Sequence, residues 1–471
     1  MSDLVFDHQR DVPPGIRLGV VRGITYGLAA PPERIMPAVR GLGAGVLRCF
    51  LYWSQIEPEP GRFVWDAVDA LLDQLDGDEE VWITVSSASL WGTVRATDML
   101  PPSPAKDLDV FAAFVRALVD RCRGRITYWQ FDNEPCVPIL WAGTVAEYAA
   151  QLKVFAAAVR ESDPAALVVL GGDPPDQQAR PGTFEYLVDV ARDDFDVYDI
   201  HLYGDPYTIP DRIAAARAMM AQHGYEMPIV AGEYNGPLIA PEDMALLGNA
   251  LQPFGEMMTG SDPEWSVLTT DMGTQAPEHD AMLAFYERMP ELPPRVQMYM
   301  RGCPPEYEEL RHRENSREIV VRNLLALASG VRRTLCWNLA PEFPGHQAPY
   351  TVLGLMFDKF ALLDYADGEL THRYPAADAL ALTARMLQGA EAIERILVAD
   401  RPELYVFDVR REDGSLLVAW ARSAEEAATY RHPWLGAAAH AVDAHGAAVP
   451  VEVADGAVTL PLTPTPLFVT R

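Results

Sequence analysis

The sequence predicts an α/β protein that consists of a (β/α)8 barrel followed by a small antiparallel β-sandwich. Short apolar, β-branched runs alternate with longer amphipathic segments from about Arg17 to Leu387. The alternation repeats eight times, which favours a closed parallel barrel over an open sheet. After Gly389 the pattern changes to short alternating runs separated by turn residues, which is typical of antiparallel strands.

Eight apolar runs are the predicted barrel strands. Between them lie segments whose apolar residues recur every three or four positions, as in Asp107–Cys122 and Val145–Glu161, and these predict helices. The second helix is expected to stop at Pro164. The predicted strands are Arg17–Ile24, Gly45–Tyr52, Val81–Ser86, Thr127–Phe131, Leu167–Gly171, Val197–Leu202, Ile229–Ala231 and Thr334–Trp337.

The connection after the seventh strand departs from a regular barrel. It runs over residues 235–314 and includes Trp265, and it is far longer than the few residues usual between a strand and its helix. Two interpretations stay open, a folded lid over the barrel mouth and a contact between subunits. We expect the barrel to occupy residues 1–388, including this insertion, and the sandwich to occupy residues 389–471.

The charge balance argues against several classes of partner. The 471 residues include 38 basic and 67 acidic side chains, a net charge of −29. Nucleic acid and anionic membranes are therefore disfavoured as partners. No apolar run approaches the roughly 20 residues that span a bilayer. The first residues, MSDLVFDHQR, lack the basic and then apolar layout of a secretion signal, so we expect a cytoplasmic protein.

Two glutamates directly follow predicted strands. Residues 127–135 read TYWQFDNEP and end on Asn133, Glu134 and a proline, and residues 228–237 read PIVAGEYNGP and contain Glu233. Because the carboxyl ends of barrel strands surround one cavity, we expect both side chains to face it. Two carboxyl groups about 5–5.5 Å apart are what retaining glycoside hydrolysis requires, one as acid and one as nucleophile.

These segments resemble the retaining glycoside hydrolases of clan A, whose acid/base and nucleophile follow strands four and seven. The resemblance covers roughly Arg17 to Leu387, and WQFDNEP is a fairly specific segment within it. It implies that Glu134 is the acid/base, that Glu233 is the nucleophile and that Asn133 binds the 2-hydroxyl of the sugar. The chain looks closest to family 39-like enzymes, which include β-xylosidases and α-L-iduronidases.

Three further polar residues are expected beside the carboxyl groups. Arg48 lies in an otherwise apolar strand, where a buried arginine needs a partner. The resemblance implies that this partner is the nucleophile, and a structural ion pair with another acid is the alternative. His201 and Tyr203 are two apart and so share one face of the sixth strand. The resemblance implies that Tyr203 donates to the nucleophile and that His201 orients either carboxylate.

Aromatic residues near the strand ends are the candidate sugar contacts. Trp337 ends the eighth strand, where its ring is expected to stack on a sugar, with core packing as the alternative. Trp91, Tyr234 and Trp141 are expected to line further subsites. Asp132 is expected to point away from the cavity.

The sequence therefore predicts a retaining glycosidase that acts on a carbohydrate or glycoside by double displacement, with no cofactor and no metal. A metal hydrolase is disfavoured because only His201 of the ten histidines stands at a strand end. The motif GxSxG of serine hydrolases is absent from the sequence. The remaining alternative is a non-catalytic carbohydrate-binding protein on a glycosidase-like barrel. The presence of both glutamates, Asn133 and Arg48 argues against such a loss of catalysis.

Overall fold

The computed structural model shows the predicted (β/α)8 barrel and the antiparallel C-terminal sheets. Part of the predicted insertion, including Trp265, lies outside the residues that it describes. The described residues are 10–28, 31–177, 179–260, 266, 278–342, 351–412, 414, 416–423 and 428–471.

Eight parallel strands form the barrel, which confirms the predicted fold class. Their order is β5-β4-β3-β2-β1-β8-β7-β6. Isolated parallel bridges, Val169 with Val197 and Asp173 with Ile200, join the two ends of this order and close the ring. The strands are β1 (Arg17–Val21), β2 (Val46–Tyr52), β3 (Glu80–Ser86), β4 (Tyr128–Phe131), β5 (Leu167–Val169), β6 (Tyr198–His201), β7 (Ile229–Tyr234) and β8 (Arg333–Trp337).

The barrel strands are apolar on both faces because side chains fill the ring and helices cover its outside. Nearly every strand residue is buried. β1 ends at Val21 instead of Ile24, and β7 continues to Tyr234 instead of ending at Ala231. Glu233 pairs with His201 of β6, and Tyr234 pairs with Cys336 of β8. These neighbours hold both residues in the strand.

Helices of the outer layer begin and end at recognisable signals. Thr144 caps one of them: its hydroxyl accepts a hydrogen bond from the Glu147 amide at 3.2 Å, and the Glu147 carboxylate accepts from the Thr144 amide at 2.7 Å. The outer helices are α1 (Met36–Gly41), α2 (Trp53–Ile56), α3 (Asp66–Leu72), α4 (Leu108–Cys122), α5 (Val145–Ser162), α6 (Thr183–Val190), η1 (Pro206–Thr208), α7 (Ile209–Gln222), α12 (Pro305–Ala328) and α14 (Pro375–Leu387).

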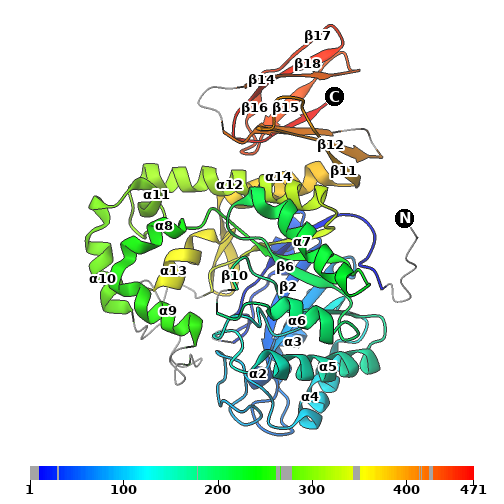
Figure 1. The fold of residues 1–471 in the computed structure, drawn as a ribbon, viewed down its shortest axis with the longest axis vertical. Helices are drawn as coiled ribbons and strands as arrows, with labels where there is room; N and C mark the ends of the chain where they lie inside the picture. The colour runs from blue at the N-terminus through cyan, green and yellow to red at the C-terminus, as the bar shows by residue number, and fades with distance from the viewer. Residues whose placement is uncertain are drawn as a thin grey trace.

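The insertion after β7 forms short helices that gather on one side of the barrel (Figure 1). They enclose a small apolar core of their own, which includes Met282, Phe285 and Val296. Val352 and Phe360, which follow β8, complete this core. The elements are α8 (Pro241–Met244), η2 (Ala245–Ala250), α9 (Leu251–Thr259), α10 (His279–Glu287), η3 (Met289–Glu291) and α11 (Pro294–Gln297), with α13 (Val352–Phe357) and η4 (Asp358–Phe360) after β8.

The C-terminal strands form two antiparallel sheets, and apolar side chains such as Val406, Leu417 and Leu460 make up a core in this part of the chain. One sheet has the order β11-β12-β13-β19-β15-β16 and the other β14-β18-β17. The strands are β11 (Ala390–Ile396), β12 (Leu404–Arg411), β13 (Leu416–Ala421), β14 (Ala428–Pro433), β15 (His440–Asp443), β16 (Ala448–Val449), β17 (Glu452–Ala454), β18 (Ala457–Leu462) and β19 (Leu467–Thr470), and a separate hairpin joins β9 (Leu363–Ala366) to β10 (Glu369–Arg373).

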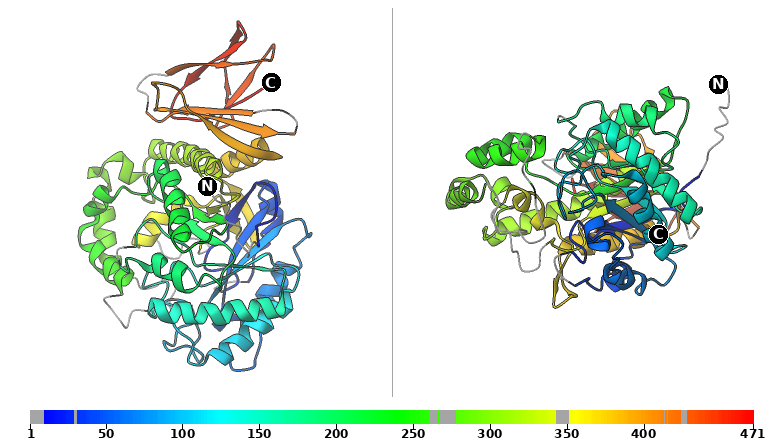
Figure 2. Two further views of the ribbon diagram at one scale, coloured as in Figure 1. Left: turned by 45° about the vertical axis from the view of Figure 1, so that its right-hand side comes forward. Right: turned by 90° about the horizontal axis from the view of Figure 1, so that it is seen from below.

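The sheets rest beside α12 and α14 in both upright views (Figures 1 and 2). Aromatic residues join them to the barrel: the Tyr405 ring lies 4.8 Å from that of Tyr207, whose hydroxyl accepts a hydrogen bond from the Trp420 indole at 3.0 Å. In the part of the chain that the structure describes, no helix is long and apolar enough to cross a membrane.

Candidate active site

Arg48 is the centre of a polar cluster inside the barrel. Its side chain is fully buried, and its guanidinium donates to Glu233 Oε1 at 2.8 Å and to Asn133 Oδ1 at 2.8 Å. It also donates to Gln130 Oε1 at 2.6 Å and to Thr84 Oγ1 at 3.0 Å. Such a forked donor set fixes its acceptors in position. Arg48 therefore ties the ends of β4 and β7 together.

Glu233 is buried and accepts hydrogen bonds on both oxygens. Arg48 donates to Oε1, and the Tyr203 hydroxyl donates to Oε2 at 2.8 Å. Burial raises the pKa of Glu233, the charge of Glu134 raises it further, and the positive charges of His201 and Arg48 oppose that rise. The ionised form of Glu233 therefore depends on these two cations.

Glu134 stands at the end of β4 with an unusual backbone. Its φ is 27°, in the left-handed region that residues other than glycine rarely adopt. Its Oε1 lies 2.6 Å from Nδ1 of His201. Glu134 is only partly buried, whereas Glu233 is nearly inaccessible. The two carboxyl groups thus differ in solvent access, which suits them to different chemical roles.

His201 bridges two acidic groups. Its Nδ1 faces Glu134, and its Nε2 lies 3.2 Å from Oδ2 of Asp199. Although burial lowers it, the negative charges of Glu233 and Asp199 raise the pKa of His201 to about 10. Burial would raise the pKa of Asp199, but His201 and Arg48 lower it below its ordinary value. The imidazole is therefore protonated at neutral pH and pairs with ionised Asp199.

One oxygen of Glu134, one of Glu233 and a ring nitrogen of His201 all lie within 4.8 Å of one another. Three such atoms are a possible ligand set by count. A metal needs a neutral imidazole, however, and the raised pKa of His201 and the Arg48 guanidinium on Glu233 both oppose a cation here. The geometry suits two carboxyl groups that act on the two atoms of one substrate bond.

Trp337 lies near this cluster, because the Phe357 ring packs between it and Tyr203. The Phe357 ring packs edge-on against Tyr203 at 6.2 Å and against Trp337 at 6.3 Å between centroids. Trp337 also contacts Phe50 at 6.4 Å and is 9% exposed. Its indole N–H has no hydrogen-bond partner among the described residues.

Other predicted contacts lie elsewhere. Tyr234 is buried, and its hydroxyl accepts from Asn323 of α12, because the residue after Glu233 in a strand points to the opposite face. Trp141 is fully buried and donates to the Thr144 carbonyl at 2.9 Å. For both residues the structure contradicts an exposed subsite and shows core packing.

Trp91 is partly buried, and the structure does not bring it into the polar cluster. Its indole donates to the Glu57 carbonyl at 2.9 Å, and its ring packs edge-on against Trp53. Asp132, expected to point away, is buried and accepts from the Ser87 amide at 3.1 Å.

Sequence reasoning missed Asp199 and Gln130. Gln130 donates to Asp199 Oδ2 at 2.9 Å, and the Gly232 amide donates to Oδ1 at 2.7 Å. The signal was present, because Asp199 is two residues before His201 and shares its face of β6. Gln130 is likewise a polar residue in the middle of an apolar strand.

Replacing Arg48 with methionine is expected to lower the free energy of unfolding by about 3–5 kcal/mol, because Glu233 then stays buried without the cation that is hydrogen-bonded to its Oε1. Urea unfolding measures the change. The matched control is Arg62→Met, which removes an exposed pair with Glu59 and should cost about 0–1 kcal/mol. Equal losses in the two variants would contradict the role of the buried pair.

The fold is shared with solved glycoside hydrolase structures. The chain has the fold of the clan A glycoside hydrolases, a (β/α)8 barrel with a C-terminal β domain, in agreement with the resemblance found in the sequence.

Three solved structures illustrate the likeness. A family 39 glycoside hydrolase from Bacteroides cellulosilyticus WH2 has a TM-score of 0.63 at 14% identity, over 96% of this chain and 80% of that one. A GH30 endoxylanase from Clostridium papyrosolvens C71 has a TM-score of 0.54 at 13% identity, over 98% of both chains. A family 51 α-L-arabinofuranosidase from Bifidobacterium longum has a TM-score of 0.53 at 13% identity, over 98% and 97%. No protein-family model and no curated protein matches the sequence.

Proposed function

We propose that this protein is a retaining glycoside hydrolase that acts on a carbohydrate or glycoside. The observation that carries the proposal is the approach of Glu134 and Glu233, whose nearest carboxylate oxygens lie within 4.8 Å. Retaining enzymes place their two carboxyl groups about 5–5.5 Å apart, whereas inverting enzymes need about 6.5–9.5 Å to admit a water between them. The short distance between the two carboxyl groups supports a mechanism with a covalent glycosyl-enzyme intermediate.

In the first half-reaction Glu233 attacks the anomeric carbon and Glu134 protonates the leaving oxygen. Arg48 and Tyr203 hold the two oxygens of Glu233 and so aim the carboxylate. Nδ1 of His201 lies 2.6 Å from Oε1 of Glu134 and so positions this carboxyl group beside the leaving oxygen. His201 then stays paired with Asp199 through its other nitrogen.

In the second half-reaction Glu134 deprotonates a water, which attacks the glycosyl-enzyme and releases the sugar with its original configuration. Arg48 donates a hydrogen bond to Oδ1 of Asn133. The NH2 group of the same side chain can therefore donate to a sugar hydroxyl. Trp337 supports the sugar ring from the side of β8.

The proteins of similar fold support the class of reaction and leave the sugar open. An endoxylanase and an α-L-arabinofuranosidase share the fold although they act on different glycosides. Specificity therefore depends on the loops around the barrel mouth.

A panel of nitrophenyl glycosides tests the proposal. We expect at least one to be hydrolysed, and proton NMR of the first product should show the anomeric configuration of the substrate. Inversion would contradict the short carboxyl gap as the working geometry. Binding of a glycoside without any hydrolysis would favour the carbohydrate-binding alternative.

The proton on His201 predicts a pH dependence of stability. Its pKa rises from 6.5 to about 10 in the folded protein, so the stabilisation that it provides is complete below about pH 6.5 and is lost as pH rises towards 10. Urea unfolding of the wild type and of His201→Gln should show a difference in stability that is larger at about pH 6 than at about pH 10. A difference that is constant with pH would mean that the imidazole is neutral.

A further inference from the structure

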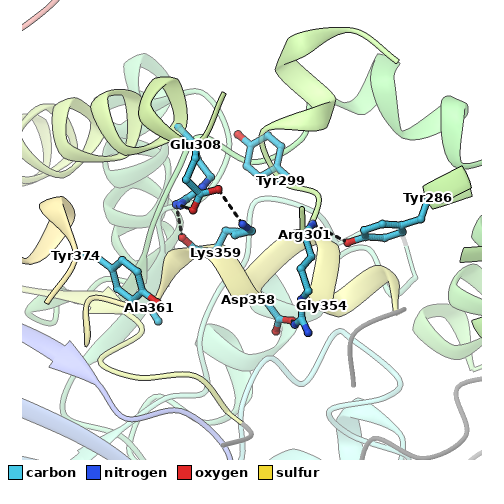
Figure 3. Close-up of a pocket in the computed structure, with 10 residues that line it drawn as sticks. Tyr286, Tyr299, Arg301, Glu308, Gly354, Asp358, Lys359, Ala361 and Tyr374 are labelled. Carbon is cyan, nitrogen blue, oxygen red and sulfur yellow. Dashed lines mark hydrogen bonds and ion pairs between the residues drawn. The ribbon is translucent and has the colours of Figure 1, made fainter. Parts of the chain in front are cut away.

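A polar cavity of about 180 Å³ lies outside the catalytic cluster, between the inserted helices, the first turns of α12 and the α13–η4 segment (Figure 3). Its charged lining residues are Arg301, Arg311 and Lys359, with the carboxylates of Glu308 and Asp358. Neither proposed catalytic glutamate lines it. The cavity is therefore a separate site.

The lining carries one more positive than negative formal charge in a chain whose net charge is −29. One carboxylate, that of Glu308, accepts from both Lys359 at 2.8 Å and Arg311 at 2.6 Å. Arg301 contacts Asp358 only at 3.4 Å, and burial raises the pKa of Asp358 to about 6. The cationic surplus favours an anion, and only one negative charge is needed to balance it.

One of these cations also has an unused donor. Arg311 is 2% exposed, and its Nε has no hydrogen-bond partner among the described residues. Because this Nε has almost no accessible surface, it cannot contact a ligand in the cavity, and Arg311 contributes to the site through its charge.

Tyrosine rings supply the remaining walls. Figure 3 shows Tyr286 and Tyr374 at opposite ends of the group, with Lys359 and Arg301 between them. Rings and hydroxyls of this kind suit a carbon skeleton that carries hydroxyl groups. Tyr299, the third ring, is held by a hydrogen bond from its hydroxyl to the Pro237 carbonyl at 2.5 Å.

The cavity is next to the catalytic cluster along the chain. Asp358 directly follows Phe357, whose ring packs against Tyr203 and Trp337. A ligand that contacts Asp358 and Lys359 would thus shift the Phe357 ring, which packs against Tyr203 beside the proposed nucleophile.

We propose that this cavity binds a small hydroxylated carboxylate, a monoanion, and that its occupancy is transmitted to the catalytic cluster through Phe357. The binding site is independent of the proposed function, whereas its effect on turnover rests on it.

Calorimetric titration of the full chain with sodium gluconate tests the binding. We expect saturable heat with gluconate and none with glucose, which lacks the charge, or with propionate, which lacks the hydroxyl groups. Absence of saturable heat with gluconate at millimolar concentrations, or equal binding of glucose, would overturn the proposal.

Variants locate the ligand. Arg301→Gln and Lys359→Gln should each weaken gluconate binding about tenfold, as expected for one charge-assisted hydrogen bond. The matched control is Arg288→Gln, an exposed arginine of the same insertion that pairs with Glu291, and it should bind like the wild type. Unfolding temperatures confirm that each variant is folded. Unchanged affinity in folded Arg301→Gln and Lys359→Gln would place the ligand elsewhere and overturn the site.

Kinetics test the transmission. Gluconate at saturation should change kcat or KM for the glycoside found in the panel, and Phe357→Ala should abolish that change while gluconate still binds. Unchanged kinetics in the wild type would overturn the transmission. Calorimetry needs no turnover, so failure of this site and failure of the glycosidase proposal are told apart.

Discussion

Glu233→Ala is expected to lower kcat/KM by on the order of 10⁵-fold, because no other group can replace the proposed nucleophile, which accepts hydrogen bonds from Arg48 and Tyr203. Steady-state assays on the best nitrophenyl glycoside measure the loss. Arg48 keeps its bonds to Asn133 and Gln130 in this variant, so the cluster should stay assembled.

Two further measurements make this prediction specific. Added azide should restore turnover by attack from the vacated side and give a glycosyl azide of inverted configuration. Glu59→Ala, which removes an exposed carboxylate, is the control and should keep wild-type activity. Undiminished activity of Glu233→Ala would remove this residue as the nucleophile.

Glu134→Ala is expected to reduce kcat by about 10²–10⁴-fold, because in the proposed mechanism the same carboxyl group serves as acid in one step and as base in the next. Substrates with good leaving groups need little acid assistance, so for them the first step should stay fast and the covalent intermediate should accumulate. KM should then fall together with kcat.

Azide distinguishes this variant from Glu233→Ala. In Glu134→Ala it should accelerate the second step and give a glycosyl azide of retained configuration, since Glu233 still forms the intermediate. Glu147→Ala, which removes the capping carboxylate of α5, is a control for loss of a glutamate outside the cluster. Lack of rescue by azide would count against Glu134 as the acid/base.

Much of the fold could be predicted because its signals are local. A parallel strand that is covered on both faces is a short run of apolar residues, and each such run can be recognised without knowledge of the rest of the chain. The placement of Glu134 and Glu233 near each other followed from the same reasoning, since both follow barrel strands. The end of β7 was misplaced because Glu233 and Tyr234 belong to the strand through their pairing with His201 and Cys336.

The side-chain partners were harder to predict. The sequence pattern places Asp199 on the same face as His201, and Glu233 and Asp199 together raise the pKa of that imidazole. The expected position of Tyr234 in the cavity is wrong, because strand alternation turns its side chain towards Asn323. Both residues show that strand alternation decides which face of the sheet a side chain occupies.

The sequence by itself determined which polar groups stand at the ends of the barrel strands and hence which reaction we propose for the barrel mouth. Only the tertiary structure decided their contacts: Arg48 reaches Glu233 across 185 positions of the chain, and the cavity beside Phe357 needs α12, the insertion and η4 together. The physical reason is that strand periodicity depends on neighbouring residues, whereas hydrogen bonds, burial and the pKa values that they set depend on how the whole chain packs.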